Sequence, residues 1–483
     1  MMIRHVLALD QGTTNTKAIL VTEAGEIVAR ASSPLATQYP RPGWAEQSAT
    51  DIWASVRAVI AEEVVKSGGI RIDAIGIANQ LETLVTWDAR TSQPICPAII
   101  WQCRRTADGG AALIAAGHDD GVVAAAGLSI NPLFPATKLA WILENVPGAR
   151  ALADQGHLRA GTVAAWLLWN LTGVVAFATD YSNASRTQMF DTAALRFSPE
   201  LCSLFGVPVA CLPVPMHSDA AFGATAGEVT ALPTGVPIRA MMGDSYAALY
   251  GDGVRAPGTV KATFGTGSSL MTLTPGRTAP RHGLSGTIAW TTTAAGTAHA
   301  LEGNITVSAQ AVAFLAMILS ADLVSALSDM AQTVADAGGA VFAPALAGLG
   351  APHWDDSATA TITGMTHGIA PAHLARAACD AIAQQLADVF GAMDWDMSHK
   401  IAGLKADGAA SANRFLMQLQ ADILGRPVQR SDVEEVGALD VASMALGAKF
   451  GPQQATEFIP VLPAVARERQ RGNWTRAVIK TRA

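Results

Sequence analysis

The sequence predicts an α/β protein built from two related domains, because strands alternate with helices and one hairpin pattern occurs twice. In the first copy, residues 6–21, an apolar run ends at Asp10, turns through Gly12-Thr13-Thr14 and resumes as a second apolar run. The second copy, residues 260–271, turns through Gly265-Thr266-Gly267, 253 residues further along a chain of 483. A repeat with this long period suggests two related domains that face one nucleotide.

The helices and strands of this α/β pattern can be placed along the chain. Apolar residues recur at helical spacing through residues 49–66, so we expect one helix there. Residues 26–33 and 70–78 have the character of strands. Further helices are expected at 111–126, 138–145, 308–319 and 372–393, and a further strand at 401–407. The polar stretch 180–187 is expected to form a turn, and the tryptophans of 162–171 to lie in the core.

The composition describes a well-filled globular protein without a basic surface. Half of the residues are hydrophobic and 15% are charged, and the net charge of -7 leaves no basic stripe for nucleic acid. The five cysteines are scattered and form no C-x-x-C pair, which is typical of reduced thiols in a cytoplasm. The N-terminal apolar run is too short for a signal peptide, and no run of roughly 18 apolar residues predicts a membrane span. We therefore expect a cytoplasmic protein with small-molecule partners.

The turn of the first hairpin has the chemistry of a phosphate cradle. Gly12 lets backbone N–H groups approach an anion, and Thr13 and Thr14 offer hydroxyl groups. Lys17 adds a positive charge, and the carboxylate of Asp10 suits a hydrated Mg²⁺. An ordinary tight hairpin would use the same residue types. The second copy of the pattern favours the phosphate interpretation.

Other candidates follow strands further along the chain. Glu82 offers a carboxylate that can accept hydrogen bonds from substrate hydroxyls, although a solvated loop charge would look the same. The aromatic side chain of Trp101 can line one side of a polyol-binding site. Asp244 ends an apolar strand, where open α/β sheets place catalysis, and it would serve equally as a helix N-cap beside Ser245. Asn413 opens a helix after a glycine turn, where amide groups can meet a base or ribose.

With these motifs in place, the chain resembles the FGGY carbohydrate kinases, and among them it is most similar to the glycerol kinases. The stretches that carry the resemblance, in chain order, are Asp10 to Thr14, Asn79 to Thr83, Trp101 to Thr106, Asp180 to Thr187, Gly265 to Gly267, Gly348 to Asp355 and Asp407 to Leu424. They run in family order over roughly residues 5–450, and several are specific when taken together.

The resemblance implies two actin-like (ribonuclease H-like) ATPase domains with a central nucleotide cleft. An N-terminal kinase domain at residues 1–250 would bind the sugar or polyol and phosphate, a C-terminal domain at 251–450 would bind ATP, and residues 451–483 would form a tail. The reaction implied is phosphoryl transfer from ATP-Mg²⁺ to a hydroxyl group, with Asp244 as the general base. The resemblance is also compatible with a homo-oligomer.

The resemblance also assigns the remaining site residues. Asp10 would organise Mg²⁺. The phosphates would be held by Thr13, Thr14 and Lys17 on one side and by Gly265 and Thr266 on the other, and Gly408, Ala409 and Asn413 would lie by the adenosine. The acceptor would meet Leu81, Glu82, Trp101, Leu133, Asp244, Ser245 and Ser269.

The departures from the glycerol kinase pattern fall mainly in the acceptor pocket. Leu81 stands in place of an arginine, Leu133 of a tyrosine, Ser245 of a glutamine and Ser269 of a phenylalanine. A site that hydrogen-bonds hydroxyls discriminates strongly by those donors, so we expect another polyol or an open-chain sugar as acceptor. A glycerol kinase with variant contacts is the alternative. In the adenosine region Ala409 replaces a glycine.

Two alternatives from other classes share part of this pattern. An actin-like ATPase that acts as a chaperone or filament subunit would share both hairpins, but has no reason to keep Glu82, Trp101 and Asp244 in their contexts. A sugar-binding relic without turnover fits the altered pocket, but not the intact Asp10, Thr13 and Asp244. A Rossmann dehydrogenase and a P-loop kinase are disfavoured because the sequence has neither G-x-G-x-x-G in its first βα unit nor G-x-x-x-x-G-K-[ST].

Overall fold

A computed structural model of the chain describes residues 4–251, 253–319, 324–397, 400–431, 436–448, 450 and 454–482. The chain divides into two compact units. Unit 1 holds residues 1–253, 286–299 and 435–452, and unit 2 holds residues 254–285, 300–434 and 453–483. Both units combine a central sheet with helices, which confirms the predicted α/β class. No helix in the described part of the chain is long and apolar enough to cross a membrane.

The central sheet of unit 1 has six strands in the order β14-β15-β5-β1-β2-β3. Their bounds are β1 His5–Gln11, β2 Asn15–Thr22, β3 Ile27–Pro34, β5 Ala74–Asn79, β14 Gly223–Ala224 and β15 Pro237–Gly243. The apolar runs that flank Gly12 form the antiparallel pair β1 and β2, as predicted. Strand β5 lies parallel to β1 on one side and to β15 on the other, so three strands end at one edge of the sheet.

A smaller five-stranded sheet and several short strand pairs complete the strands of unit 1. The sheet contains β4 Glu46–Gln47, β6 Leu84–Asp88, β7 Gln93–Pro94, β8 Ala98–Ile99 and β9 Leu158–Thr162. The pairs are β10 Ala178–Asp180 with β13 Val214–Met216, and β11 Phe190–Asp191 with β12 Arg196–Phe197. Trp87 of β6 packs against Trp166 with ring centroids 5.1 Å apart, in the core predicted for that segment.

The helices of unit 1 surround these sheets. They are α1 Ala49–Lys66, α2 Ala107–Ala115, α3 Asp119–Ala126, α4 Pro135–Asn145, α5 Ala149–Asp154, α6 Val163–Leu171, α7 Tyr181–Ser185, α8 Pro199–Leu204, α9 Asp244–Gly251, α14 Val436–Leu446 and the 3₁₀ turn Val209–Cys211. Helix α1 confirms the predicted bounds; the hydroxyl of Ser48 caps it by accepting from the Asp51 amide at 3.1 Å.

Two expectations about local structure were wrong. The helix expected at 111–126 is interrupted, because Gly117 adopts a φ of 84° that ends α2 before α3 begins. The turn expected at 180–187 is the short helix α7. Asp180 caps α7 with both carboxylate oxygens, which accept from the amides of Ser182 and Asn183.

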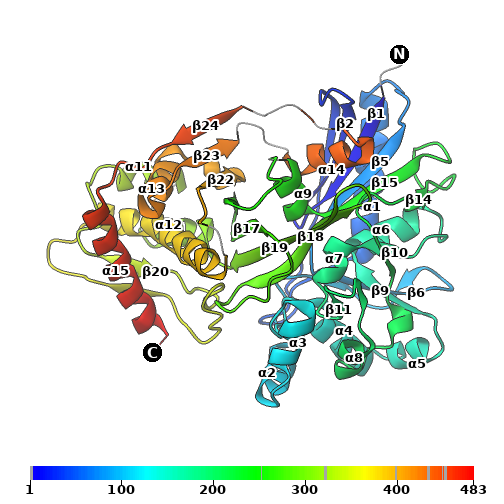
Figure 1. Cartoon of the computed structure of the whole chain (residues 1–483), viewed down its shortest axis with the longest axis horizontal. Helices are drawn as coiled ribbons and strands as arrows, with labels where there is room; N and C mark the ends of the chain where they lie inside the picture. The colour runs from blue at the N-terminus through cyan, green and yellow to red at the C-terminus, as the bar shows by residue number, and fades with distance from the viewer. Residues whose placement is uncertain are drawn as a thin grey trace. The chain divides into compact units, whose positions relative to one another are not determined.

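Helix α14 belongs to unit 1, although its first residue, Val436, lies 185 positions after Gly251, the last residue of α9. Figure 1 shows this orange helix beside the blue strands β1, β2 and β5. Gly76 of β5 permits the approach, since a Cβ there would lie 2.8 Å from the carbonyl oxygen of Val441. Unit 1 is therefore assembled from three separate stretches of the sequence.

The sheet of unit 2 contains seven strands in the order β18-β19-β17-β16-β22-β23-β24. Their bounds are β16 Thr259–Phe264, β17 Ser268–Thr274, β18 Ser285–Thr292, β19 Gly296–Ile305, β22 Gly403–Asp407, β23 Val428–Ser431 and β24 Ala455–Phe458. Strands β16 and β17 form the second predicted hairpin, and β22 lies parallel to β16. Residues 286–299, which include all of β18 except Ser285 and the first four residues of β19, are part of unit 1.

The helices of unit 2 are α10 Ala309–Ile318, α11 Val324–Ala331, α12 Pro371–Asp396, α13 Arg414–Leu424, α15 Ala464–Thr481 and the 3₁₀ turn Ala409–Ala412. A small pair of strands, β20 Val341–Ala343 and β21 Thr361–Thr363, completes the unit. Residues 454–482, within the segment that we predicted as a tail, supply β24 and α15. Trp474 of α15 is buried, and its indole N–H donates to Asp388 at 2.6 Å.

Candidate active site

Three parallel strands bring the polar residues of unit 1 to one edge of its sheet. In the register of β1 and β5, Asp10 lies opposite Ala78 and Gln11 opposite Asn79. Gly243, the last residue of β15, also lies opposite Asn79, so Asp244 follows at the same edge. The carboxyl ends of parallel strands are where open α/β sheets place their ligands. Asp10 and Asp244, which are 234 positions apart in sequence, therefore lie at the same edge of the sheet.

Gln80, the first residue after β5, ties the first hairpin turn to this edge. Its amide oxygen accepts from the hydroxyls of Thr13 at 3.2 Å and Thr83 at 2.8 Å. The indole N–H of Trp101 donates to the Thr13 hydroxyl at 2.9 Å. The single proton of Thr13 is thus directed at Gln80, so the side chain predicted to donate to a phosphate is part of an internal network. The amide N–H of Gln47 donates to the Thr13 carbonyl at 2.7 Å.

Asp244 has the properties of a proton acceptor near neutral pH. It is half-buried at the start of α9, and one carboxylate oxygen accepts from the Ser245 amide at 2.6 Å. Burial raises the pKa of Asp244 to about 7, and the charges of Asp10 and Glu82 also raise it. A general base works best when its pKa lies near the operating pH.

A buried polar network that sequence reasoning missed supports the strand ends. The side chains of Asn79 and Asn183 exchange two amide hydrogen bonds, at 3.0 and 3.1 Å. Asp180 accepts from the Asn183 side chain at 2.8 Å and from the Ser218 hydroxyl at 2.7 Å. The Ser182 hydroxyl accepts from the Gly243 amide at 3.0 Å, next to Asp244. Residues 180–187, which we expected to form a simple turn, therefore support the strand ends through buried hydrogen bonds.

The predicted acceptor residues of unit 1 differ in their environments. Leu81 is buried against Gly243, where an added Cβ would lie 2.5 Å from its side chain. Glu82 is 7% exposed, and one carboxylate oxygen accepts from Nε of the buried Arg186 at 2.6 Å. Leu133 and Trp101 are half-buried. The position where the glycerol kinase pattern has an arginine is thus an apolar contact in this chain.

The turn of the first hairpin is accessible. Thr14 is exposed, while Gly12, Thr13 and Lys17 are half-buried. The Gly12 amide donates to the Asn15 carbonyl at 3.0 Å, which closes the turn. Lys17 lies opposite Asp10 in the register of β1 and β2, so their opposite charges neighbour each other beside the turn.

The second hairpin turn, in unit 2, is closed by the same kind of bond. The Gly265 amide donates to the Gly267 carbonyl at 3.0 Å. The carbonyls of Gly265 and Thr266 accept from the first amides of α10, at 3.2 Å from Ala309 and 2.9 Å from Ser308. Thr266 is exposed and Gly265 is half-buried, so the turn is open to a ligand. The half-buried Ser269 donates its hydroxyl to the buried Glu302 at 3.3 Å.

The predicted adenosine residues follow β22 in unit 2. Gly408 has a φ of 87° and packs on β16, where a Cβ would lie 2.5 Å from the Phe264 carbonyl oxygen. Gly408 and Ala409 are exposed. The Asn413 side chain caps α13 by accepting from the Leu416 amide at 3.1 Å, and it donates to the Ser328 hydroxyl at 2.8 Å. Asn413 therefore shapes this region through protein contacts.

The donor set suits Mg²⁺ held partly by substrate. Mg²⁺ usually takes one or two carboxylates plus substrate phosphates and water, rather than a cage of protein ligands. Among the residues that the structure describes, no group of three or more His, Cys, Asp or Glu side chains is placed to hold a metal ion. Asp10 raises the pKa of Asp244, so the two negative charges interact, and a cation between them would relieve their repulsion. The residues present fit the ion.

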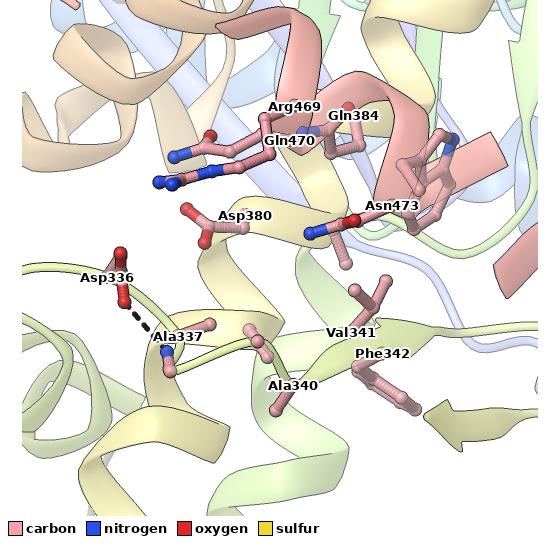
Figure 2. A pocket seen from close by; sticks show the side chains of 15 residues that line it. Asp336, Ala337, Ala340, Val341, Phe342, Asp380, Gln384, Arg469, Gln470 and Asn473 are labelled. Atoms are coloured by element: carbon pink, nitrogen blue, oxygen red, sulfur yellow. Dashed lines mark hydrogen bonds between the residues drawn. The ribbon is translucent and has the colours of Figure 1, made fainter. Parts of the chain in front are cut away.

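A cavity of about 330 Å³ in unit 2 is separate from these residues. Figure 2 shows Arg469, Gln470 and Asn473 of α15 on one side and Asp380 of α12 facing them. None of the predicted site residues lines this cavity in the described part of the chain. This cavity is therefore not part of the candidate site at the strand ends and hairpin turns.

Comparisons with known proteins agree with this architecture. The N-terminal domain of the FGGY family of carbohydrate kinases matches residues 5–251, and the C-terminal domain matches residues 260–448. A glycerol kinase of Symbiobacterium thermophilum is 43% identical, over 99% of this chain and 98% of the relative. An apulose kinase of Pectobacterium atrosepticum is 42% identical, over 95% and 92%.

Solved structures show the same fold over the full length. A Plasmodium falciparum glycerol kinase with ADP gives a TM-score of 0.92 at 28% identity, covering 99% of this chain and 98% of that one. A xylulose kinase of Rhodospirillum rubrum gives 0.87 at 26% identity, covering 99% of both chains. These matches confirm the two-domain fold expected from the resemblance. By its sequence over nearly the whole length and by its fold, the chain belongs to the FGGY family of carbohydrate kinases, which phosphorylate alcohol groups with ATP.

Proposed function

We propose that this kinase phosphorylates a hydroxyl group of a polyol or open-chain sugar larger than glycerol. The observation that carries the proposal is that the parallel strands of unit 1 bring Asp10, Asp244 and the loop that carries Glu82 to one edge of the sheet. Asp244 accepts the proton of the attacking hydroxyl, since burial raises its pKa to about 7. Glu82 accepts hydrogen bonds from other hydroxyls of the same acceptor.

The donor residues have separate roles in the proposal. Asp10 holds Mg²⁺, which supplies neutralisation of phosphate charge when bound. The first turn contributes its backbone amides, the Thr14 hydroxyl and the charge of Lys17 to the phosphates. In unit 2, Gly265 and Thr266 contact the phosphates through their turn, and Gly408 and Ala409 lie against the adenosine. Phosphoryl transfer needs mainly positioning and charge neutralisation, which these residues provide.

The acceptor differs from glycerol because its pocket has lost donors and gained room. Leu81 is packed against Gly243 and presents no hydrogen-bonding group, and Leu133 likewise has none. Ser245 and Ser269 are shorter than the glutamine and phenylalanine of the glycerol kinase pattern. The relatives include a glycerol kinase at 43% identity and an apulose kinase at 42% identity.

An acceptor panel tests the proposal. The kinase is assayed by ADP release with ATP and Mg²⁺ over glycerol, tetritols, pentitols and ketopentoses, with Asp244→Asn as the inactive control. We expect kcat/KM for a four- or five-carbon acceptor to exceed that for glycerol by at least about ten-fold. A wide margin in favour of glycerol would instead identify a glycerol kinase with variant contacts.

A further inference from the structure

Lys138, on helix α4, is buried in unit 1 although it carries a charged side chain. Its side chain has 0% exposure, and its neighbours on the helix, Ala136 and Leu139, belong to an apolar core. Burial lowers the pKa of Lys138 to about 7, and the charge of Glu82 opposes that lowering. Burying an ammonium group is costly unless its N–H groups are satisfied. Its bonding partners therefore indicate what the residue does.

The Lys138 ammonium donates to two backbone carbonyls that belong to the acceptor pocket. One is the carbonyl of Glu82 at 2.8 Å, and the other is the carbonyl of Leu133 at 2.7 Å. Glu82 is 56 positions away in sequence, in the loop between β5 and β6, whereas Leu133 lies two residues before the start of α4. Lys138 thus connects two pocket segments that no strand pairing joins within the described residues.

The backbone at Glu82 needs such a connection. Its φ is 59°, in the left-handed region, which costs a residue with a Cβ about 1 kcal/mol or more. The hydrogen bond from Lys138 holds the carbonyl of that same residue, and so fixes the peptide that follows it. A change at Lys138 would release the peptide from the orientation that this conformation requires.

The carboxylate of Glu82 is held by a different residue from the one that holds its backbone. Nε of Arg186 donates to it at 2.6 Å, and the Arg186 guanidinium lies 5.0 Å from the centre of the Phe134 ring. Phe134 is the residue after Leu133, so both cations act on the same two segments. Arg186 orients the carboxylate of Glu82, and Lys138 orients its backbone.

We propose that Lys138 is the positioning residue of the acceptor site, which sets where the Glu82 carboxylate and the Leu133 side chain meet the substrate. The inference rests on the proposed function, because it takes Glu82 and Leu133 as acceptor contacts. Lys138 does not touch the substrate. It acts through the two carbonyls that it holds.

The test replaces Lys138 and separates acceptor binding from nucleotide binding. In Lys138→Met the apolar stem remains and both hydrogen bonds are lost. We expect the acceptor KM to rise about ten-fold or more, while the KM for ATP changes less than two-fold. Lys138→Gln keeps an N–H₂ group on a shorter side chain and should recover part of the acceptor affinity.

A neighbouring residue supplies the matched control. Thr137 is buried on the same helix, and its hydroxyl pairs with the Thr106 hydroxyl at 2.9 Å; its bond to the Phe134 carbonyl is long, at 3.4 Å, and it does not bond to the carbonyl of Glu82 or Leu133 among the described residues. Thr137→Val removes a buried hydrogen bond from α4 and should leave both KM values unchanged. Melting temperatures of all variants show whether a KM change reflects the pocket or the whole unit.

The outcomes distinguish this inference from the proposed function. If the wild-type kinase phosphorylates no acceptor of the panel, the proposed function fails. If the wild type is active, the positioning role fails when Lys138→Met raises both KM values equally, or when Thr137→Val gives the same acceptor KM. Failure of both Lys138 variants to fold would assign the residue to the core and overturn the proposal.

Discussion

The two hairpin turns are each closed by a backbone hydrogen bond from a glycine amide, but they have different supports. In each, a glycine amide closes the turn with a 3.0 Å bond, and a Cβ on that glycine would lie 3.2 Å from the same accepting carbonyl oxygen. The first turn is held by side chains, since Thr13 is bonded to Gln80 and Trp101. The second is held by the first amides of α10. Two turns that are closed in a similar way are thus supported by different parts of the protein.

This difference indicates which substrate should bind less well when each turn is changed. The supports of the first turn, Gln80 and Trp101, adjoin the acceptor residues, so a change there is expected to affect both substrates. The supports of the second turn are backbone atoms of unit 2, so a change there is expected to affect the nucleotide alone. Four experiments test or refine this contrast.

The largest effect is expected at Asp244, the predicted general base in unit 1. Asp244→Asn removes the proton acceptor, so kcat should fall by at least about 100-fold in the ADP-release assay. The dissociation constant for ATP, measured by calorimetry, should change little. Retained turnover would refute the assignment of Asp244 as the base.

A matched pair of threonine variants tests the contrast directly. Thr13→Val keeps the shape of the side chain but breaks its bonds to Gln80 and Trp101, so the acceptor KM should rise about ten-fold. Thr266→Val, at the exposed position of the second turn, should raise the KM for ATP alone. Equal effects of the two variants on the acceptor KM would remove the distinction between the turns.

The glycines should differ in stability rather than kinetics. A Cβ on Gly267 would lie 2.5 Å from the Ile305 carbonyl oxygen, so Gly267→Ala should destabilise the protein by about 1–3 kcal/mol. Gly12→Ala meets its nearest atom at 3.2 Å and should cost less. Urea unfolding of both variants measures the difference, and a larger loss for Gly12→Ala would contradict it.

The smallest effect is a dependence of stability on pH. The pKa of Asp244 is raised in the folded state, so its ionisation opposes folding as pH rises from its ordinary range through about 7. Without Mg²⁺, Asp244→Asn should therefore gain melting temperature relative to the wild type between pH 5 and 8. A constant difference in melting temperature across that range would show that the surroundings of Asp244 do not raise its pKa.

Local patterns predicted much of the fold and little of the support for the site. The periodicity of 49–66 predicted α1, and the apolar runs around Gly12 and Gly265 predicted both hairpins. The resemblance predicted the family. The roles assigned to the sixteen site residues remain predictions, although the structure brings those of unit 1 to one edge of a sheet.

What was missed depends on contacts that are distant in sequence. Lys138 looks like a surface charge in a helical pattern, and only the fold brings its ammonium to the carbonyl of Glu82. Asp180 and Asn183 resemble ordinary turn residues in the sequence, but their hydrogen bonds to each other, to Asn79 and to Ser218 support the strand ends. Helix α14 was missed because its partner strands lie in the other half of the chain.

The return of α14 to unit 1 has a consequence for protein engineering. A fragment ending at residue 251 would lack the helix that covers Gly76 and would expose the apolar face of β1 and β5 to water. A chimaera meant to transplant acceptor specificity must therefore exchange residues 286–299 and 436–448 together with the N-terminal half. The modules that can be recombined in this kinase are sets of segments rather than single stretches of the gene.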